Sequence, residues 1–396
     1  MEMKTLIELY DERPLENFLA ADVFRPERIV YLCPSAIAQS RNEQKKITDY
    51  IAWRNMKAET VFMDTSLLHT DKVYRQLETV VSRYPDCAID ITGGSDAALF
   101  AAGQFCASTN LPAFTYSRKK QRFFNISNAE FAENVKPEIT YKVEDYFLMA
   151  GGNMQEGRVE SESLYKYYDK IDDFFALFLK FRKQWGRIIT WFQRASQQDK
   201  NAVEFSLHVH SSVTVKGDRG NKITIDEVFL QKAEQLGFIL NLKKQHEDQI
   251  EFDFADRQTR FWLRDIGSVL ELYTWKACVD SGLFNDVLCS TIVHWENTEN
   301  NETVTNEIDV TASFGIIPVF ISCKTCPIDT DALNELAILK DHFGGNGAKA
   351  FAVSSENTRP ITRRRASVLG IDIISLDDLK KGKLSDQFKI YFQHIS

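Results

Sequence analysis

The chain has 396 residues, of which 44% are hydrophobic and 26% charged, and its formal net charge is −8. This length exceeds what one hydrophobic core usually serves, so we expect two or three domains of a globular α/β protein. The negative charge excludes a generally basic nucleic-acid-binding protein, because attraction to phosphates would have to come from local basic patches. No apolar run is long enough to span a membrane and the first residues do not read as a signal peptide, so we expect a cytoplasmic protein without membrane contact.

Short apolar strands alternate with helices at the start of the chain. We expect strands at 3–10, 28–33, 59–63, 87–92 and 113–116, and helices at 40–56, 70–83 and 97–107. This alternation predicts a parallel, doubly wound sheet. Sheets of this kind bind ligands at the carboxyl ends of their strands.

One predicted strand end carries the turn Thr92-Gly93-Gly94-Ser95-Asp96, which leads directly into a helix. Its glycines allow close backbone approach, and the free N–H groups of the helix and the hydroxyls of Thr92 and Ser95 suit a phosphate or a sugar edge. The alternative is plain helix capping by Ser95 or Asp96. The spacing matches neither the dinucleotide fingerprint nor a P-loop.

The middle of the chain gives weaker signals. The basic run 118–122 is either a solvated hairpin end or a contact for ligand phosphate, and the glycine pair 151–152 marks the end of the first domain. Residues 161–198 form a predicted long helical region whose aromatic stripe indicates core or dimer contact.

Residues 204–256 combine two β-rich segments with a helix, which allows a winged-helix fold. The polar face of that helix carries Asp226, Glu227 and Glu234, which would repel phosphate, so we interpret the segment as a connecting domain. His208 and His210 share a strand face but lack a third ligand at metal spacing.

The seven cysteines are an odd number and lie mostly within apolar runs, which predicts reduced core thiols. Cys323 and Cys326 form a close pair, but a zinc site needs a second pair at suitable spacing.

Three charged residues stand out after residue 266. A predicted helix at 268–276 carries Glu271, and a hairpin turning at Gly315 places Asp309 on its first strand and Lys324 at the end of its second. Charges at the ends of apolar strands must be paired, coordinated to a metal or functional. A simple cross-strand ion pair is the alternative. Further along the chain, the arginines of 362–365 either bind a nucleic-acid backbone or are solvated.

This order of elements, from 267 to 374, resembles the PD-(D/E)xK nuclease superfamily. The resemblance implies that Glu271 and Asp309 hold Mg²⁺ or Mn²⁺ while Lys324 stabilises charge or positions the attacking water. The family usually has an acid two residues before the lysine, where this chain has Ser322. The metal shell would therefore need a backbone carbonyl near Cys323 and water, with Glu307 as a supporting ligand.

Together, the predicted Rossmann-like first domain, its Thr92 to Asp96 turn and this nuclease-like domain resemble the CARF-domain nucleases of type III CRISPR systems. The resemblance implies a CARF domain at 1–150, a linker helix and connecting region at 151–260 and a restriction-endonuclease-like domain at 261–396. It also implies a homodimer that binds a cyclic oligoadenylate, for which we expect cyclic tetra-adenylate. The ligand positions carried over are Tyr10, Asp11, Pro34, Ser35 and the turn Thr92, Gly93, Gly94, Ser95 and Asp96.

We therefore expect a metal-dependent endonuclease that is activated by cyclic tetra-adenylate and cleaves single-stranded DNA or RNA in antiviral defence. Two alternatives remain open. In one, Ser322 marks a decayed site and the protein is a regulator without catalysis. In the other, the chain is a constitutive restriction or repair nuclease.

Overall fold

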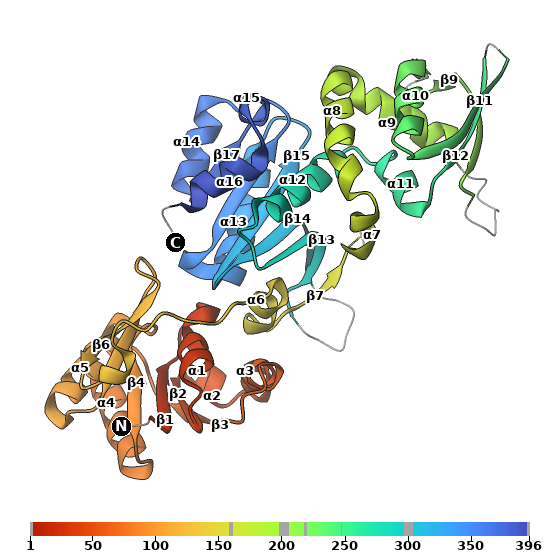
Figure 1. Cartoon of the computed structure of the whole chain (residues 1–396). Helices are drawn as coiled ribbons and strands as arrows, with labels where there is room; N and C mark the ends of the chain where they lie inside the picture. The colour runs from red at the N-terminus through yellow and green to blue at the C-terminus, as the bar shows by residue number, and fades with distance from the viewer. Residues whose placement is uncertain are drawn as a thin grey trace.

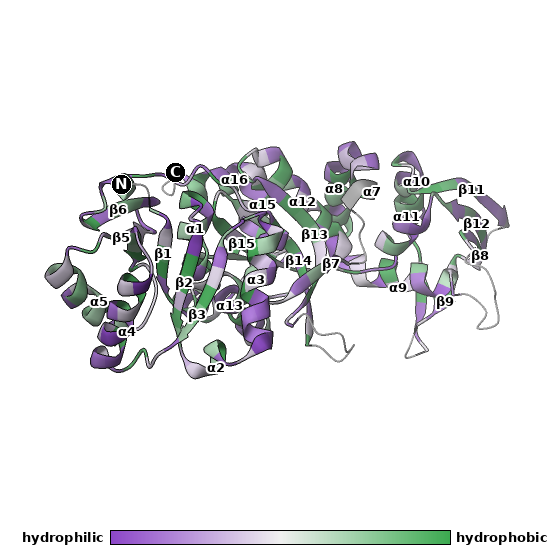
Figure 2. Ribbon diagram, turned by 90° about the horizontal axis from the view of Figure 1, so that it is seen from below, coloured by the Kyte–Doolittle hydropathy of each residue, from purple (hydrophilic) through white to green (hydrophobic). Residues whose placement is uncertain are grey.

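The computed structural model describes residues 3–157, 161–197, 206–217, 220–246, 248–296 and 304–393. Three parts lie in a row: the N-terminal sheet at one end, the C-terminal sheet in the middle and residues 161–262 at the other end (Figure 1 and Figure 2). None of the helices in the described ranges has the length and apolar character needed to cross a membrane.

The N-terminal sheet has the strand order β3-β2-β1-β4-β5-β6. Its strands are β1 (Thr5–Leu9), β2 (Arg28–Cys33), β3 (Glu59–Asp64), β4 (Cys87–Asp90), β5 (Ala113–Ser117) and β6 (Arg122–Ser127). The first five are parallel and β6 is antiparallel at the edge, which confirms the Rossmann-like expectation. The order reverses between β1 and β4, so the loops after these two strands open a crevice.

Short helices surround this sheet. They are α1 (Leu19–Phe24), α2 (Ser35–Ala38), α3 (Arg41–Trp53), α4 (Thr70–Arg83) and α5 (Asp96–Thr109), with 3-10 turns η1 (Pro14–Asn17) and η2 (Glu130–Ala132). Strands β1 and β4 are buried along their whole length, as expected for central parallel strands covered on both faces.

The C-terminal sheet has the order β17-β16-β15-β14-β13-β7. Its strands are β7 (Asn153–Glu156), β13 (Asp286–His294), β14 (Thr305–Phe314), β15 (Ile317–Lys324), β16 (Lys349–Ser354) and β17 (Ile371–Ile374). The predicted hairpin is confirmed, since β14 and β15 pair antiparallel around Gly315. Because β7 joins this sheet, part of the expected connecting region packs with the C-terminal domain, and the limits 1–150, 151–260 and 261–396 stay a prediction.

Helices cover both faces of the C-terminal sheet. They are α6 (Val143–Met149), α12 (Ser268–Ser281), α13 (Thr330–Gly344), α14 (Pro360–Val368), α15 (Leu376–Lys381) and α16 (Leu384–Phe392), with the 3-10 turn η5 (Gly345–Gly347) after α13. Ile321 of β15 packs in the same core cluster as α12, whereas its neighbour Phe320 packs with α13. The hairpin is therefore held between two helices, as its alternating apolar residues require.

The third part combines helices with two small sheets. Its elements are α7 (Ser161–Lys166), η3 (Tyr168–Lys170), α8 (Ile171–Phe181), η4 (Arg182–Gln184), α9 (Trp185–Ala195), β8 (His208–Ser212), β9 (Thr214–Lys216), β10 (Lys222–Thr224), α10 (Glu227–Gln235), β11 (Ile239–His246), β12 (Gln249–Phe254) and α11 (Arg257–Trp262). The expected helical region is present over 161–197 as α7, α8 and α9, joined by the 3-10 turns η3 and η4, and residue 198 lies outside the described ranges. Its aromatic residues pack in the core, where Phe175 stacks on Tyr273 of α12 and Phe181 packs against Phe229 of α10.

Candidate functional sites

A cavity of about 550 Å³ opens in the crevice of the N-terminal sheet. This volume is in the range of small-molecule sites. It is lined by residues after β1, β2, β3 and β4, namely Tyr10, Asp11, Glu12, Arg13, Pro34, Ser66, Leu67, Leu68, Gly94 and Ser95. Five of the predicted ligand positions thus come together, whereas no sequence signal pointed to the contribution from residues 66–68.

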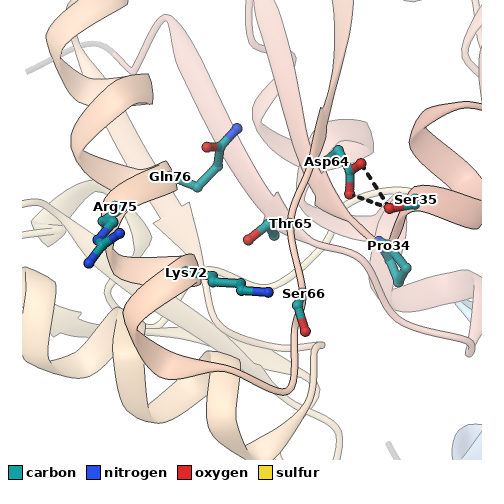
Figure 3. Close-up of a pocket in the computed structure, with 8 residues that line it drawn as sticks. All are labelled: Pro34, Ser35, Asp64, Thr65, Ser66, Lys72, Arg75 and Gln76. Carbon is teal, nitrogen blue, oxygen red and sulfur yellow. Dashed lines mark hydrogen bonds between the residues drawn. The ribbon is translucent and has the colours of Figure 1, made fainter.

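A second cavity, of about 590 Å³, lies beside the first and shares Pro34 and Ser66 with it. Figure 3 shows Ser35, whose hydroxyl donates to both carboxylate oxygens of Asp64 at 2.8 Å. Lys72 and Arg75 of α4 also line this cavity and make it suitable for an anionic ligand. The sequence did not reveal them, because an amphipathic helix pattern does not tell which polar residues face a cavity.

Asp11 holds the crevice together. Its Oδ2 accepts a hydrogen bond of 2.8 Å from the backbone N–H of Gly94, and Arg13 donates to both of its carboxylate oxygens at 2.8 and 2.7 Å. Burial opposes ionisation of this carboxyl, but the bonds from Arg13 and Gly94 outweigh it and lower the Asp11 pKa. Asp11 therefore shapes the cavity wall and fixes Arg13 there.

The hydroxyls of the glycine-containing turn form hydrogen bonds with other groups of the protein. Thr92 Oγ1 donates to Asp90 Oδ1 at 2.5 Å and accepts from the Tyr116 backbone N–H at 2.8 Å. Ser95 caps α5, accepting from the Ala98 N–H at 3.2 Å. Ser95 thus acts as the helix cap of the capping alternative and also lines the first cavity, and the expectation that the Thr92 and Ser95 hydroxyls contact a ligand stays a prediction.

The two glycines of the turn are required by the fold. Gly94 has φ +101°, and a Cβ there would lie 2.8 Å from Leu9 Cβ, while a Cβ at Gly93 would lie 3.0 Å from Asp11 Cβ. Close packing of the turn against Leu9 and Asp11 therefore requires glycine at both positions. Asp96 is exposed at the first position of α5.

A buried pair of carboxyls lies beneath this turn. Glu8 of β1 and Asp90 of β4 are register partners on adjacent strands. Burial raises the pKa of Asp90 to about 7, and burial together with the Asp90 charge raises the pKa of Glu8 well above its usual value. Neither residue was singled out from the sequence.

In the C-terminal sheet, Asp309 of β14 lies beside Ser322 and Cys323 of β15. Asp309 Oδ2 accepts a hydrogen bond of 2.6 Å from the Cys323 backbone N–H and one of 3.3 Å from the Ser322 hydroxyl. Asp309, Ser322 and Lys324 line one small pocket with Glu307 and with Glu335 of α13. Burial raises the pKa of Asp309, and the positive charge of Lys324 works against that rise.

Glu271 of α12 belongs to the same electrostatic cluster. Burial raises its pKa, and the charges of Asp309, Asp265 and Glu307 add to the effect while Lys324 opposes it. Gly267 makes room for this side chain, since a Cβ there would lie 2.5 Å from Glu271 Oε1. The structure thus brings together the three residues that were predicted to be catalytic.

The chemistry of this cluster fits a divalent cation. Buried carboxylates that repel one another are relieved by a metal ion, and hard oxygen ligands suit Mg²⁺ or Mn²⁺. Among the described residues, however, no three His, Cys, Asp or Glu side chains gather closely enough to hold one ion. Burial raises the pKa of the Cys323 thiol well above its usual value, so its sulfur is a poor metal ligand, and the backbone carbonyl of Cys323 stays a predicted ligand. An ion held by two carboxylates would keep positions for this carbonyl and for water.

Other predicted contacts are engaged elsewhere. Arg118 pairs with the buried carboxylate of Glu16, so this residue of the basic run 118–122 is not part of a fully solvated hairpin end. Arg363 donates to Ser375 at 2.8 Å and Arg365 donates to Asn334 at 2.8 Å, which holds α14 to its neighbours. All seven cysteines are free thiols, as expected.

Comparison with known proteins gives one family and several structures. Residues 256–395 match the family model described as Card1-like, endonuclease domain. Protein VC1899 from Vibrio cholerae has a similar fold, with a TM-score of 0.75 and 17% identity over 99% of this chain and 98% of that one. Can2 from Sulfobacillus thermosulfidooxidans, solved in complex with cyclic tetra-adenylate, has a TM-score of 0.69 and 16% identity over 100% of this chain and 98% of that one. Comparison with curated proteins finds no match.

Proposed function

We propose that the chain is a metal-dependent nuclease activated by cyclic tetra-adenylate in type III CRISPR defence, on the premise that residues 256–395 match the Card1-like endonuclease domain. The observation that carries the proposal is that this segment contains Glu271, Asp309 and Lys324, which share one buried electrostatic cluster. Its substrate is single-stranded DNA or RNA.

Each residue of the cluster has a role in this proposal. Glu271 and Asp309 hold the cation, and the N–H of Cys323 and the hydroxyl of Ser322 fix the Asp309 carboxylate. When bound, the metal ion lowers the pKa of a water and so supplies the nucleophile. Lys324 places a positive charge where the scissile phosphate gains negative charge.

The two N-terminal cavities receive the activator. Arg13 at the wall of one cavity and Lys72 and Arg75 in the other supply positive charge for its phosphates. The fold similarity to Can2, whose structure contains cyclic tetra-adenylate, supports this choice of ligand. Leu68 beside the cavity is 76% exposed and Phe100 on α5 is 60% exposed, and we assign both to a homodimer interface that closes around the ring.

The test is a cleavage assay on labelled single-stranded DNA and RNA with Mn²⁺ or Mg²⁺, with and without cyclic tetra-adenylate. The wild type should cleave only with metal and activator together. Asp309→Asn and Lys324→Met should lower the rate by about 100-fold or more and still bind the activator, because metal and activator occupy different domains. Cleavage without the ring would indicate a constitutive nuclease, and ring binding without cleavage would indicate a regulator.

A further inference from the structure

A chain of charged contacts runs from the activator cavity into the interior of the protein. Asp11 binds the Gly94 N–H and is paired with Arg13, whose Nη1 lies 3.6 Å from Glu16 Oε1. Glu16 also pairs with Arg118 of the β5–β6 hairpin. We call Asp11, Arg13, Glu16 and Arg118 the charge network.

The centre of this network is buried and incompletely satisfied. The Glu16 side chain is 2% exposed, and among the described residues its Oε2 has no hydrogen-bond partner. Nη1 of Arg118 is likewise buried without a hydrogen-bond partner in that part of the chain. A buried carboxylate is costly unless cations compensate it, so Glu16 depends on both arginines.

The far end of the network touches the C-terminal domain. A Cβ at Gly347 would lie 2.8 Å from Arg118 Nη1, and a Cβ at Gly345 would lie 3.5 Å from the Arg13 side chain. Both glycines belong to η5, directly after α13. Figure 1 shows the β5–β6 hairpin reaching toward the C-terminal domain at this place.

Helix α13 connects this contact to the candidate nuclease site. Its residues Glu335, Leu336 and Leu339 line the same pocket as Asp309 and Lys324. The β14–β15 hairpin, which carries Asp309 and Lys324, is anchored separately at its turn. Ile316 of this turn is buried in the N-terminal core, and the Gly315 carbonyl accepts a hydrogen bond from the Tyr141 N–H at 3.0 Å. The β14–β15 wall of the pocket is thus fixed to the sensor domain, and the α13 wall contacts the same domain through the charge network.

We propose that the charge network transmits activator binding to α13 and thereby to the nuclease site, an inference that rests on the proposed function. A phosphate bound at the cavity wall competes with Glu16 for Arg13. Glu16 then pairs with Arg118 alone. The Arg118 guanidinium moves relative to Gly347, and α13 shifts against the β14–β15 hairpin, which carries Asp309 and Lys324.

The test separates binding from activation. Glu16→Gln keeps the shape of the side chain and removes its charge, and Glu16 does not line the cavity. Affinity for cyclic tetra-adenylate, measured by calorimetry, should be kept or rise, because the carboxylate that competes for Arg13 has lost its charge, while the ratio of cleavage rates with and without the ring should fall by about 10-fold or more. Glu59→Gln is the matched control, since it breaks the Arg28–Glu59 ion pair of the same domain away from this contact and should leave the ratio unchanged.

Gly347→Ala provides a second variant that leaves the sensor domain intact. The added methyl displaces the flexible end of Arg118, so it should also lower the activation ratio without loss of affinity. Hydrogen exchange of α13 should respond to the ring in the wild type and not in either variant. If Glu16→Gln and Gly347→Ala both keep the wild-type activation ratio, the inference is overturned while the proposed function stands. Absence of activation in the wild type would overturn the proposed function and the inference with it.

Discussion

Gly267 sets the position of Glu271, because a Cβ at residue 267 would overlap the Glu271 carboxylate. Gly267→Ala should therefore displace this side chain and slow cleavage by about 10-fold or more, as loss of a supporting contact at a metal site does. The free energy of unfolding should change by less than about 1 kcal/mol, because the atom displaced is the end of a flexible side chain.

Gly186→Ala is the control, since a Cβ there meets only Ile266 at an ordinary 3.8 Å. The cleavage rate and the thermal unfolding curve should be recorded for Gly267→Ala and for Gly186→Ala. An unchanged cleavage rate in Gly267→Ala would contradict the assignment of Glu271 to the site.

Ser322 occupies the position where the PD-(D/E)xK pattern usually has an acid, and its hydroxyl donates to Asp309. With fewer carboxylates, Mn²⁺ should support cleavage better than Mg²⁺, which keeps its waters and demands stricter geometry. Ser322→Glu should raise metal affinity or shift the preference toward Mg²⁺, and Ser322→Ala should have a small effect. Titration of each metal against cleavage rate decides this, and an inactive Ser322→Ala would show that the hydroxyl itself is catalytic.

Asp90 makes stability depend on pH. Its pKa in the folded protein, about 7, is above the value of an unfolded aspartate, about 3.9, so the folded state binds more protons between these values. The contribution of Asp90 to the free energy of unfolding is therefore present below pH about 4 and is lost as the pH rises to about 7. Asp90→Asn should be more stable than the wild type at pH 8, by on the order of 2 kcal/mol, and the gain should shrink toward pH 4.

Denaturant unfolding at several pH values measures this difference. Glu78→Gln, at an exposed position of α4, is the control and should leave the pH dependence unchanged. A variant less stable than the wild type at pH 8 would show that the carboxylate is compensated in the folded protein.

At the scale of elements, α5 and the loop before α4 present the exposed apolar side chains of Phe100 and Leu68. Phe100→Glu should convert the proposed homodimer to a monomer, because a charge at the centre of an apolar contact is strongly unfavourable. Analytical ultracentrifugation measures the change. Val368→Glu, at a position 87% exposed on α14, should leave the dimer intact. A wild-type monomer would refute the dimer assignment.

Local signals made many elements predictable. The expected bounds of the strand at 28–33 and the helix at 70–83 agree with β2 and α4, because apolar runs and amphipathic spacing are local properties. The contacts of the aromatic residues in 161–197 with α12 and α10 join distant parts of the chain, so no local pattern contains them. Gly94→Val, which the sequence alone offers as a test of ligand binding, would disturb β1 itself, since φ and the Leu9 contact both require glycine.

The candidate sites were predictable to a similar degree. Order and spacing pointed to Glu271, Asp309 and Lys324, and the hairpin register then placed Ser322 against Asp309. The internal use of the Thr92 and Ser95 hydroxyls could not be foreseen, because Asp90, Tyr116 and Leu67 reach them only in the folded chain.

At the scale of the whole molecule, the C-terminal sheet lies between the N-terminal sheet and residues 161–262 (Figure 1). It is therefore in position to receive a signal from the activator cavities through α13 and the β14–β15 hairpin. The central claim is that ring binding in the first domain switches on cleavage in the second.

The most direct test is the rate of single-strand cleavage during titration of a known concentration of protein with cyclic tetra-adenylate. The rate should rise from background and saturate at one ring per two chains, and Asp309→Asn should remain at background throughout. A rate that is independent of the ring, or one that Asp309→Asn retains, would contradict the account.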